Sequence, residues 1–379
     1  MKRDNKVMLL VLSVLSMVVA TIYSPWGLAQ ALLPFPALSG SYQVGHTELD
    51  MTDTARLEIY TEEPDDQRRL LVSLYYPASV PADATPSAYI TPELAAALGV
   101  PQEFQNQIST SYANAPISDG NFPVLIFSPG AGNMTQYYSS LLSELASRGF
   151  VVAGIWPTYS ANIALFPDGT LIKRSPAAEV TGESLEEQLA SIATVGAVWV
   201  EDQRFVLSQL ERLNTSDPLL EGHLDVSRVG VFGHSLGGAA AVETAYQDER
   251  FDAALNMDGT MFGAVTTAGS RVPFMFLQSD PPPPTDEQIA GWGITRAEFD
   301  AEDQLLLDAV DLVVDNSPNG SSLAKLKGSR HRTYMIDQLF FTPRMSAEQK
   351  TNVLGDVDPM RAYQQIVTWV SDFMAMHLQ

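Results

Sequence analysis

The sequence predicts an α/β fold with a mostly parallel central sheet covered by helices on both faces. Short apolar runs alternate with helical patterns along most of the chain, as expected for parallel strands joined by crossover helices. The 379 residues are 45% hydrophobic and 18% charged, which suits one large core. Finally, a β-rich run at 228–232 leads into a glycine-rich turn and a helix of small residues.

The N-terminus has a different character from the rest of the chain. Three basic residues among the first six precede the apolar stretch 7–22, and small residues follow at Ala29 and Ala31. This order predicts a signal peptide over residues 1–31 and export to the periplasm or the medium, with no stable membrane insertion after cleavage. An uncleaved membrane anchor is the alternative, although the apolar run is short for a span.

Residues 32–379 are predicted to form one domain with two cap-like insertions, at about 78–120 and 280–320. The first half opens with an extended segment at 32–45 and an antiparallel pair of strands. Buried strands and a helix ended by Gly149 follow the first insertion. The expected elements are strands at 57–60 and 70–76, a short helix at 92–98, a strand at 122–128, a helix at 136–148 and a strand at 150–156.

The second half continues the alternation of strands and helices and contains no internal repeat. Asp280 and four prolines open the second insertion, which is partly helical. The expected elements are a long helix at 185–213, the strand 228–232 and its helix, strands at 253–257 and 273–278, a helix at 302–314, a strand at 323–326 and a closing helix at 363–377.

Charge and composition exclude several classes of function. The formal net charge of −23 argues against binding nucleic acid or docking on anionic lipid. The chain has no cysteine, which excludes disulfides, cysteine catalysis and thiolate metal sites. Its five histidines are scattered, so we expect no metal site and no cofactor. The oligomeric state is left open.

The hexapeptide 233–238, Gly-His-Ser-Leu-Gly-Gly, is the strongest functional signal. It matches a nucleophile elbow, in which a serine at a strained φ/ψ lies between a strand and a helix that pass closely. Gly233 and Gly237 supply the small neighbours that this approach requires. The alternative is a tight turn whose serine only caps the helix, which leaves the flanking glycines unexplained. The pattern therefore predicts Ser235 as a nucleophile.

A serine nucleophile needs a base, which is nearly always histidine. Of the five histidines, His46 and His223 precede the serine, His234 adjoins it and points away, and His377 lies near the chain end, where we expect it at the surface. His331 remains, in a loop after the last predicted strand. That loop lies at the carboxyl edge of the sheet, where such sites assemble.

The positions of residues along the chain also suggest candidates for the triad acid and the oxyanion hole. Asp258 and Asp280 each end a strand between the serine and the histidine, and position alone does not choose between them. An oxyanion hole needs two backbone N–H groups. The amide of Leu236, directly after the nucleophile, is one candidate. The amide of Ala131, in the glycine-rich loop after the strand 122–128, is the other.

Several segments together resemble one family of α/β-hydrolases, the platelet-activating factor acetylhydrolases of the plasma and type II kind. The pieces occur in family order and span roughly residues 40 to 337. They are Gly-Ser-Tyr-Gln-Val-Gly at 40–45, Leu-Tyr-Tyr-Pro at 74–77, Phe-Ser-Pro-Gly-Ala-Gly at 127–132, the hexapeptide at 233–238, Met-Asp-Gly at 257–259 and Gly-Ser-Arg-His at 328–331.

The resemblance implies an α/β-hydrolase fold and an exported serine esterase acting on short-acyl or lipid esters. It also implies Asp258 as the acid, and the amides of Ala131 and Leu236 as the oxyanion hole. The chain departs from the family at Pro129, where the acetylhydrolases carry histidine, and in its long 280–320 insertion. A secreted lipase or polyesterase is the alternative enzyme. A binding module of the same fold that has lost its chemistry is the alternative from another class.

Overall fold

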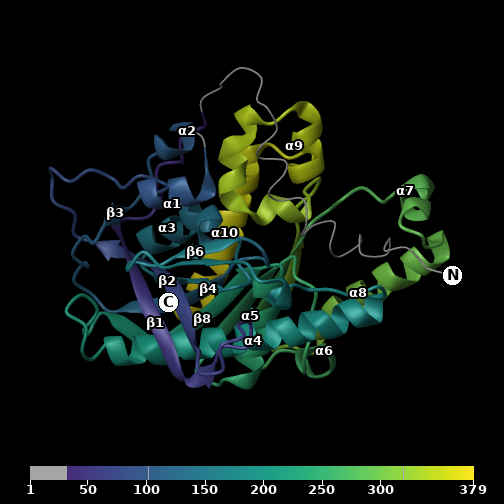
Figure 1. Ribbon diagram of the computed structural model, residues 1–379, viewed down its shortest axis with the longest axis horizontal. Coiled ribbons are helices and arrows are strands. Elements are labelled where there is room, and N and C mark those ends of the chain that lie inside the picture. The colour runs from purple at the N-terminus through teal and green to yellow at the C-terminus, as the bar shows by residue number, and fades with distance from the viewer. Residues whose placement is uncertain (1–31, 101, 319) are drawn as a thin grey trace.

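The computed structural model describes residues 32–100, 102–318 and 320–379, so the predicted signal peptide lies outside the described residues (Figure 1). A nine-stranded sheet runs through the molecule in the order β11-β10-β9-β8-β4-β5-β2-β1-β3. Its strands are β1 (Gln43–Leu57), β2 (Gln67–Ala78), β3 (Tyr112–Ala113), β4 (Phe122–Ser128), β5 (Val151–Trp156), β8 (Leu224–His234), β9 (Ala253–Met257), β10 (Phe274–Gln278) and β11 (Ser322–Lys325). A small hairpin of β6 (Ile163–Leu165) and β7 (Leu171–Lys173) stands apart from it.

The strands from β5 through β4, β8, β9 and β10 to β11 all run parallel, whereas β2 pairs antiparallel with both β5 and β1. This arrangement confirms the predicted mostly parallel sheet. Because parallel strands end at the same edge, the residues that follow β4, β8 and β9 lie side by side. That edge is where the site residues were predicted to meet.

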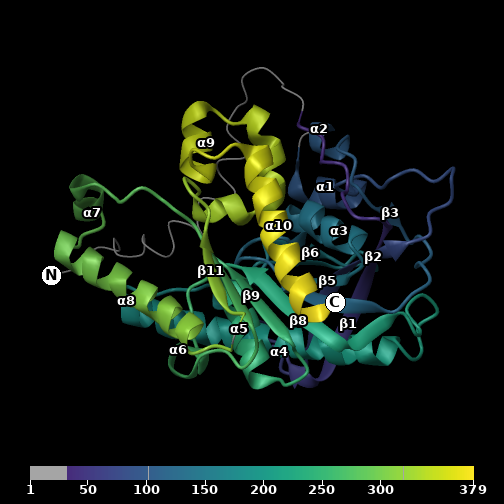
Figure 2. The ribbon, with the colours of Figure 1, turned by 180° about the vertical axis from the view of Figure 1, so that it is seen from behind.

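Helices cover both faces of the sheet, as Figures 1 and 2 show from opposite sides. Along β4, Leu125 and Phe127 join the core under α3 and α10, and Val124 and Ile126 join the core under α4 and α5. All seven residues of β4 are buried, which explains why this strand reads as a continuous apolar run. The covering helices are α3 (Ser139–Ser147), α10 (Pro359–Leu378), α4 (Leu185–Leu213) and α5 (Leu236–Gln247).

The remaining helices are short or peripheral. They are α1 (Pro92–Leu98), α2 (Gln102–Gln105), α6 (Val265–Ala268), α7 (Asp286–Gly291), α8 (Arg296–Asp315) and α9 (Ala347–Leu354), with 3-10 turns η1 (Thr135–Tyr138), η2 (Pro176–Ala178), η3 (His331–Tyr334) and η4 (Ile336–Arg344). No helix in the described part of the chain has the length and apolarity needed to cross a bilayer.

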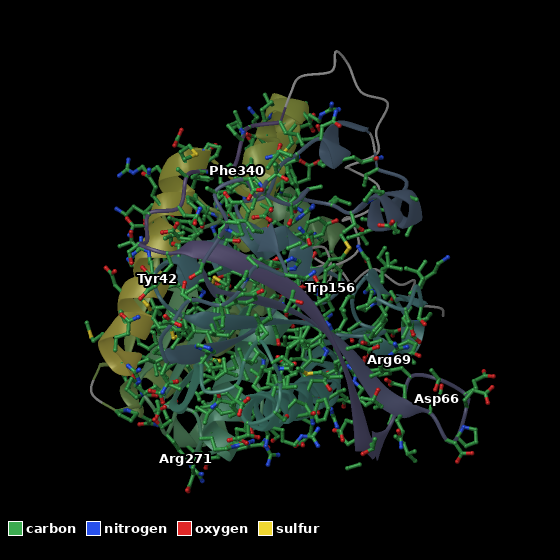
Figure 3. All side chains as sticks on the ribbon, turned by 90° about the vertical axis from the view of Figure 1, so that its left-hand side faces the viewer. Tyr42, Asp66, Arg69, Trp156, Arg271 and Phe340 are labelled. Carbon is green, nitrogen blue, oxygen red and sulfur yellow. The ribbon has the colours of Figure 1, made fainter. Side chains whose placement is uncertain are left out.

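The first predicted strand is placed wrongly by the sequence. The strand runs over Gln43–Leu57, so only Leu57 of the predicted strand 57–60 belongs to β1, and residues 58–60 begin the turn to β2. Leu57 and Ile59 are 60% and 63% exposed, so these apolar residues take no part in the core. Most of β1 is polar, and its period-2 apolar signal is short, because Asp53 follows Leu49 and Met51 on the same face. Figure 3 shows Asp66 in the loop that joins the two strands, projecting from the body.

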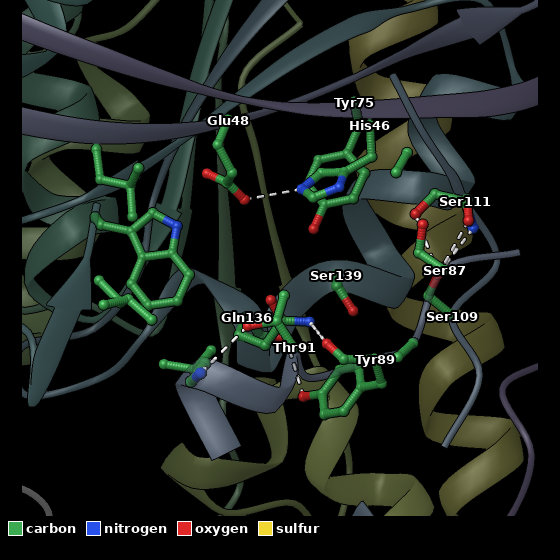
Figure 4. A pocket seen from close by; sticks show the side chains of 16 residues that line it. His46, Glu48, Tyr75, Ser87, Tyr89, Thr91, Ser109, Ser111, Gln136 and Ser139 are labelled. Atoms are coloured by element: carbon green, nitrogen blue, oxygen red, sulfur yellow. Dashed lines mark hydrogen bonds and ion pairs between the residues drawn. The ribbon is translucent and has the colours of Figure 1, made fainter. Parts of the chain in front are cut away.

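The 78–120 insertion packs over the end of the sheet formed by β1 and β2 and encloses a cavity of about 180 Å³ (Figure 4). His46 and Glu48 of β1 line one wall, and their side chains are joined by a hydrogen bond of 2.9 Å. Glu48 also accepts from the Ser73 hydroxyl, at 2.9 Å. Ser87, Ser109 and Ser111, from the insertion, line the opposite side.

The 280–320 insertion forms α7 and α8. The buried Val310 and Val313 of α8 join the same core as α4 and α5, and α8 packs on α6 and β10. Figures 1 and 2 show α7 standing out from the side of the molecule. The expectation that this insertion caps the pocket stays a prediction, as does the division of the chain into one domain after residue 31.

Candidate active site

Ser235 lies at the junction of β8 and α5 with φ 55° and ψ −127°. A positive φ is costly for a residue with a side chain and persists only where the surroundings impose it. Two hydrogen bonds hold the turn: the Ser235 amide donates to the Met257 carbonyl at 2.8 Å, and the Ala239 amide donates to the Ser235 carbonyl at 3.0 Å. The backbone therefore has the conformation predicted for a nucleophile elbow.

The glycines around Ser235 are required by close backbone contacts. A Cβ added to Gly233 would lie 2.4 Å from the carbonyl carbon of Gly237, and one added to Gly237 would lie 2.3 Å from the Ser128 carbonyl oxygen. A Cβ on Gly130 would lie 3.2 Å from the Cβ of Ser235. Strand, helix and the loop after β4 thus meet at this turn without room for another methyl group.

Asp258 follows β9 directly and also has a positive φ, of 60°. Its amide donates to the Leu277 carbonyl at 2.8 Å. One carboxylate oxygen accepts from the Ser279 amide at 2.7 Å, and the other contacts His331 Nδ1 at 2.8 Å. The side chain of Asp258 is 11% exposed. The strained backbone and these two bonds direct the carboxylate at the histidine.

Asp258 is charged at neutral pH. Burial by itself raises the pKa of Asp258, but the hydrogen bond from His331, its charge and the amide of Ser279 outweigh burial. The net result is a pKa below the ordinary value. An ionised carboxylate on Nδ1 keeps the proton of a neutral imidazole on that nitrogen. This leaves Nε2 of His331 with a free lone pair.

His331 begins η3, and its loop is held from several sides. The Gly328 amide donates to the Asp280 carboxylate at 3.1 Å, and the Arg330 amide donates to the Thr333 hydroxyl at 2.9 Å. Asp280, the other candidate acid, therefore bonds the loop that carries His331. The carboxylate that contacts the imidazole is that of Asp258.

The residue before Ser235 contacts His331 and so connects the elbow to the histidine loop. The His331 ring lies 4.6 Å, centroid to centroid, from the ring of His234, the residue before Ser235. Within the described chain, the Ser235 hydroxyl forms no hydrogen bond with His331 or any other group. The bond between nucleophile and base is often long in enzymes without substrate and shortens when substrate binds. The structure thus assembles the Asp258–His331 pair at the edge of the sheet that carries Ser235.

The loop after β4 carries the amide of Ala131, which was predicted to contribute to the oxyanion hole. The amides of Gly130, Gly132 and Asn133 donate to the Tyr138 hydroxyl, the Ser160 carbonyl and the Gly130 carbonyl. Among the described residues, the amide of Ala131 has no acceptor. The amide of Leu236, in the first turn of α5, has no intrahelical acceptor either. These are the two amides predicted for the oxyanion hole.

His46, His223 and His377 have partners outside the group formed by Ser235, Asp258 and His331. His46 bonds Glu48, and His223 Nδ1 bonds the Gly120 carbonyl at 2.9 Å. His377, expected at the surface, is half-buried against Phe373. No three His, Asp or Glu side chains gather as metal ligands do in the residues that the structure describes.

Sequence reasoning missed the residues that support the site. The His234 side chain lies in a buried set of hydrogen bonds rather than in inert packing. Asn256, one strand position before Met257, binds both the amide and the carbonyl of Gly259 and so shapes the turn that contains Asp258. A buried asparagine next to a predicted catalytic turn is a signal that could have been used.

Comparison with known proteins identifies the family. The sequence model for platelet-activating factor acetylhydrolase, isoform II, matches residues 29–166 and 213–379, which is most of the chain. The chain belongs to this family. The resemblance seen in the sequence is thereby confirmed. The matched segments leave out residues 167–212, which include β7 and nearly all of α4.

Two curated relatives carry related names. The probable 1-alkyl-2-acetylglycerophosphocholine esterase of Arthroderma benhamiae is 28% identical over 271 residues, 65% of this chain and 64% of that protein. The platelet-activating factor acetylhydrolase of Cavia porcellus is 29% identical over 192 residues, 44% of this chain and 42% of that protein. The matches thus span less than two thirds of either relative.

A solved structure resembles the chain over nearly its full length. The ferulic acid esterase from Streptomyces cinnamoneus superposes with a TM-score of 0.72 and 25% identity, covering 92% of this chain and 94% of that one. Together with the sheet order and the helical layers, this match confirms the predicted α/β-hydrolase fold.

Proposed function

We propose that the chain is a serine carboxylic-ester hydrolase with Ser235 as nucleophile, His331 as base and Asp258 as the acid of the triad. The observation that carries the proposal is the 2.8 Å contact between Asp258 and His331 Nδ1 at the sheet edge where Ser235 has its strained turn. Esterase and acetylhydrolase relatives support the same reaction class.

The proposed reaction has two halves. His331 Nε2 takes the proton of Ser235 Oγ as the oxygen attacks the ester carbonyl carbon. The amides of Ala131 and Leu236 donate to the oxyanion that develops. Its collapse expels the alcohol, which takes the proton from His331. Water then attacks the acyl-enzyme by the same route and releases the acid and free Ser235. Asp258 stabilises the imidazolium in both halves.

For the substrate we propose short-acyl esters, including acetylated lipids. The support is the family membership and the names of the curated relatives. A second candidate is an ester of an aromatic acid, because the ferulic acid esterase superposes on 92% of this chain with 25% identity.

A substrate panel tests these proposals. Hydrolysis of p-nitrophenyl esters of increasing acyl length, an acetylated phospholipid and methyl ferulate would be measured with wild type and Ser235→Ala. Highest kcat/KM on acetyl esters supports the first candidate, and highest kcat/KM on methyl ferulate supports the second. Absence of hydrolysis across the panel, or full activity in Ser235→Ala, would contradict the esterase proposal.

We also propose that the chain is exported after cleavage within its N-terminal 31 residues. The basic start, the apolar stretch 7–22 and the small residues Ala29 and Ala31 support this. N-terminal sequencing of the protein recovered from a secreting host tests it. A mature chain that begins after Ala29 or Ala31 is the expected result, and an intact Met1 in a membrane pellet would favour the anchor.

A further inference from the structure

Three hydrogen bonds join the loop after β4, here called the oxyanion loop because it contains Ala131, to the loop that carries His331. They pass through His234, the residue before Ser235. The Gly130 amide contacts the Tyr138 hydroxyl at 3.3 Å, the same hydroxyl contacts His234 Nδ1 at 2.7 Å, and His234 Nε2 contacts the His331 carbonyl at 3.1 Å. The first contact is to the backbone one residue before Ala131. The last is to the backbone of the proposed base.

The chemistry of the two ends fixes the direction of all three bonds. A carbonyl oxygen only accepts, so His234 Nε2 carries the proton and donates to His331. In a neutral ring Nδ1 then has a lone pair, which accepts the Tyr138 hydroxyl proton. The Tyr138 oxygen in turn accepts the Gly130 N–H. Every bond is satisfied in one consistent arrangement, running from Gly130 to His331.

The surroundings keep this arrangement neutral and rigid. His234 is 1% exposed and Tyr138 is fully buried, packed against Phe127. Burial lowers the pKa of His234 well below its usual range, and the charge of the nearby His331 adds to this. Burial also raises the pKa of the Tyr138 hydroxyl above its ordinary value. Neither group therefore gains or loses a proton near neutral pH.

We propose that His234, with Tyr138, is a positioning residue that holds the His331 backbone and the loop of Ala131 in fixed positions relative to Ser235. His234 precedes Ser235 directly in the chain, so the position of its ring is tied to the backbone of the elbow. One nitrogen places the His331 backbone, and the other, through Tyr138, places the loop of Ala131. The inference rests on the proposed function of Ser235 and His331, and it deepens that function.

The arrangement has a specific consequence for rate. Asp258 orients the His331 ring, and the backbone position of His331 also sets how far Nε2 lies from Ser235. Loss of the His234 or Tyr138 bonds would leave the triad residues in place and misalign them. A displacement of about 1 Å can cost about 100-fold in rate. The loss would appear in kcat, because substrate contacts made before the chemical step are unchanged.

Three variants test the inference. Tyr138→Phe removes the hydroxyl and keeps the packed ring, His234→Leu removes both ring nitrogens, and His234→Gln restores a donor that can reach the His331 carbonyl. We expect kcat per site, counted by fluorophosphonate titration, to fall about 10- to 100-fold in Tyr138→Phe and about 100-fold or more in His234→Leu. KM should stay within about twofold, and His234→Gln should recover at least about tenfold over His234→Leu.

Tyr76→Phe is the matched control, because Tyr76 is buried and its hydroxyl donates to the Ala115 carbonyl at 2.8 Å, away from the site. It should keep wild-type kcat. If Tyr138→Phe keeps wild-type kcat while Ser235→Ala is inactive, the positioning role is wrong and the esterase proposal stands. If Ser235→Ala retains activity, the esterase proposal itself fails. Should His234→Leu not fold, Tyr138→Phe decides alone.

Discussion

The described residues contain two histidine–carboxylate pairs of almost the same length, in two regions with different surroundings. His331 contacts Asp258 at 2.8 Å beside the elbow, and His46 contacts Glu48 at 2.9 Å in the cavity beneath the first insertion. Asp258 contacts Nδ1 of its histidine and is 11% exposed, whereas Glu48 contacts Nε2 and is 31% exposed. Their imidazoles are otherwise similarly exposed, at 22% of each side chain.

The surroundings of the two pairs are the reason that we propose a catalytic role for one and not for the other. Among the described residues, Nε2 of His331 and the amides of Ala131 and Leu236 have no hydrogen-bond partner, and the strained turn of Ser235 lies at the same edge of the sheet. The ring of His46 stacks on Tyr75, and Ser109 and Ser111 in its cavity bond one another. What distinguishes the sites is the strand-end geometry, because parallel strands bring Ser235, Asp258 and the oxyanion loop to one edge.

Replacing the two histidines is the change with the largest expected contrast. His331→Gln should lower kcat by about 10⁶-fold, as loss of the base does in other serine hydrolases. His46→Gln should leave kcat within about twofold. Both would be measured on p-nitrophenyl acetate with protein whose folding is checked by circular dichroism. Comparable losses in the two variants would remove the distinction drawn between the pairs.

The two carboxylates give the next contrast. Asp258→Asn keeps the shape but allows the wrong imidazole tautomer, so we expect kcat to fall by about 10⁴-fold. Glu48→Gln should have no measurable effect on kcat. The assay is the same, and near wild-type activity of Asp258→Asn would show that another group orients His331.

Asp280 offers a smaller and more graded effect. Its carboxylate accepts from the Gly328 amide and so supports the loop before His331. Asp280→Asn can keep an acceptor there, and we expect kcat to fall no more than about tenfold. Steady-state kinetics beside Asp258→Asn would rank the two aspartates. A loss larger than that of Asp258→Asn would reverse the assignment of the acid.

Buried carboxylates should also differ in how they couple stability to pH. The pKa of Asp258 is lowered in the folded state, so its charge stabilises the fold above the unfolded pKa of about 3.9, and this is lost on further acidification. Burial raises the pKa of Asp337 to about 6. Through Asp337, the free energy of unfolding of the protein therefore falls as pH rises from about 4 to about 6, by an amount on the order of 2 kcal/mol.

Urea unfolding of wild type, Asp258→Asn and Asp337→Asn between pH 3 and pH 7 measures both effects. The free-energy difference between wild type and Asp258→Asn should shrink below about pH 4. Wild type should lose stability relative to Asp337→Asn as pH rises. Parallel curves for all three proteins would contradict both assignments.

Much of the fold could be predicted because its buried strands are short apolar runs between clear turns. The bounds of β4, β9 and α4 match the expected ranges. The first strand was misplaced because β1 is mostly polar. A strand is recognised from the sequence when one or both of its faces are apolar, and the apolar face of β1 is interrupted by Asp53 after Leu49 and Met51.

Only the site residues that lie in a local sequence motif could be predicted. The elbow, the loop after β4 and the histidine loop each carry a local pattern, and elimination selected His331. Asp258 and Asp280 could not be separated by position, since both follow neighbouring strands. The bond from Tyr138 to His234 joins residues 96 positions apart, so no local pattern predicts it.

The central claim is that Ser235 is the nucleophile activated by His331 and Asp258. Incubation with a fluorophosphonate, followed by digestion and mass spectrometry of the labelled peptide, tests this directly. The expected result is one adduct per chain, on Ser235, formed at a rate that falls by several powers of ten in His331→Gln and is unaffected in His46→Gln. An active protein labelled at another residue, or at Ser235 with equal speed in His331→Gln, would contradict the claim.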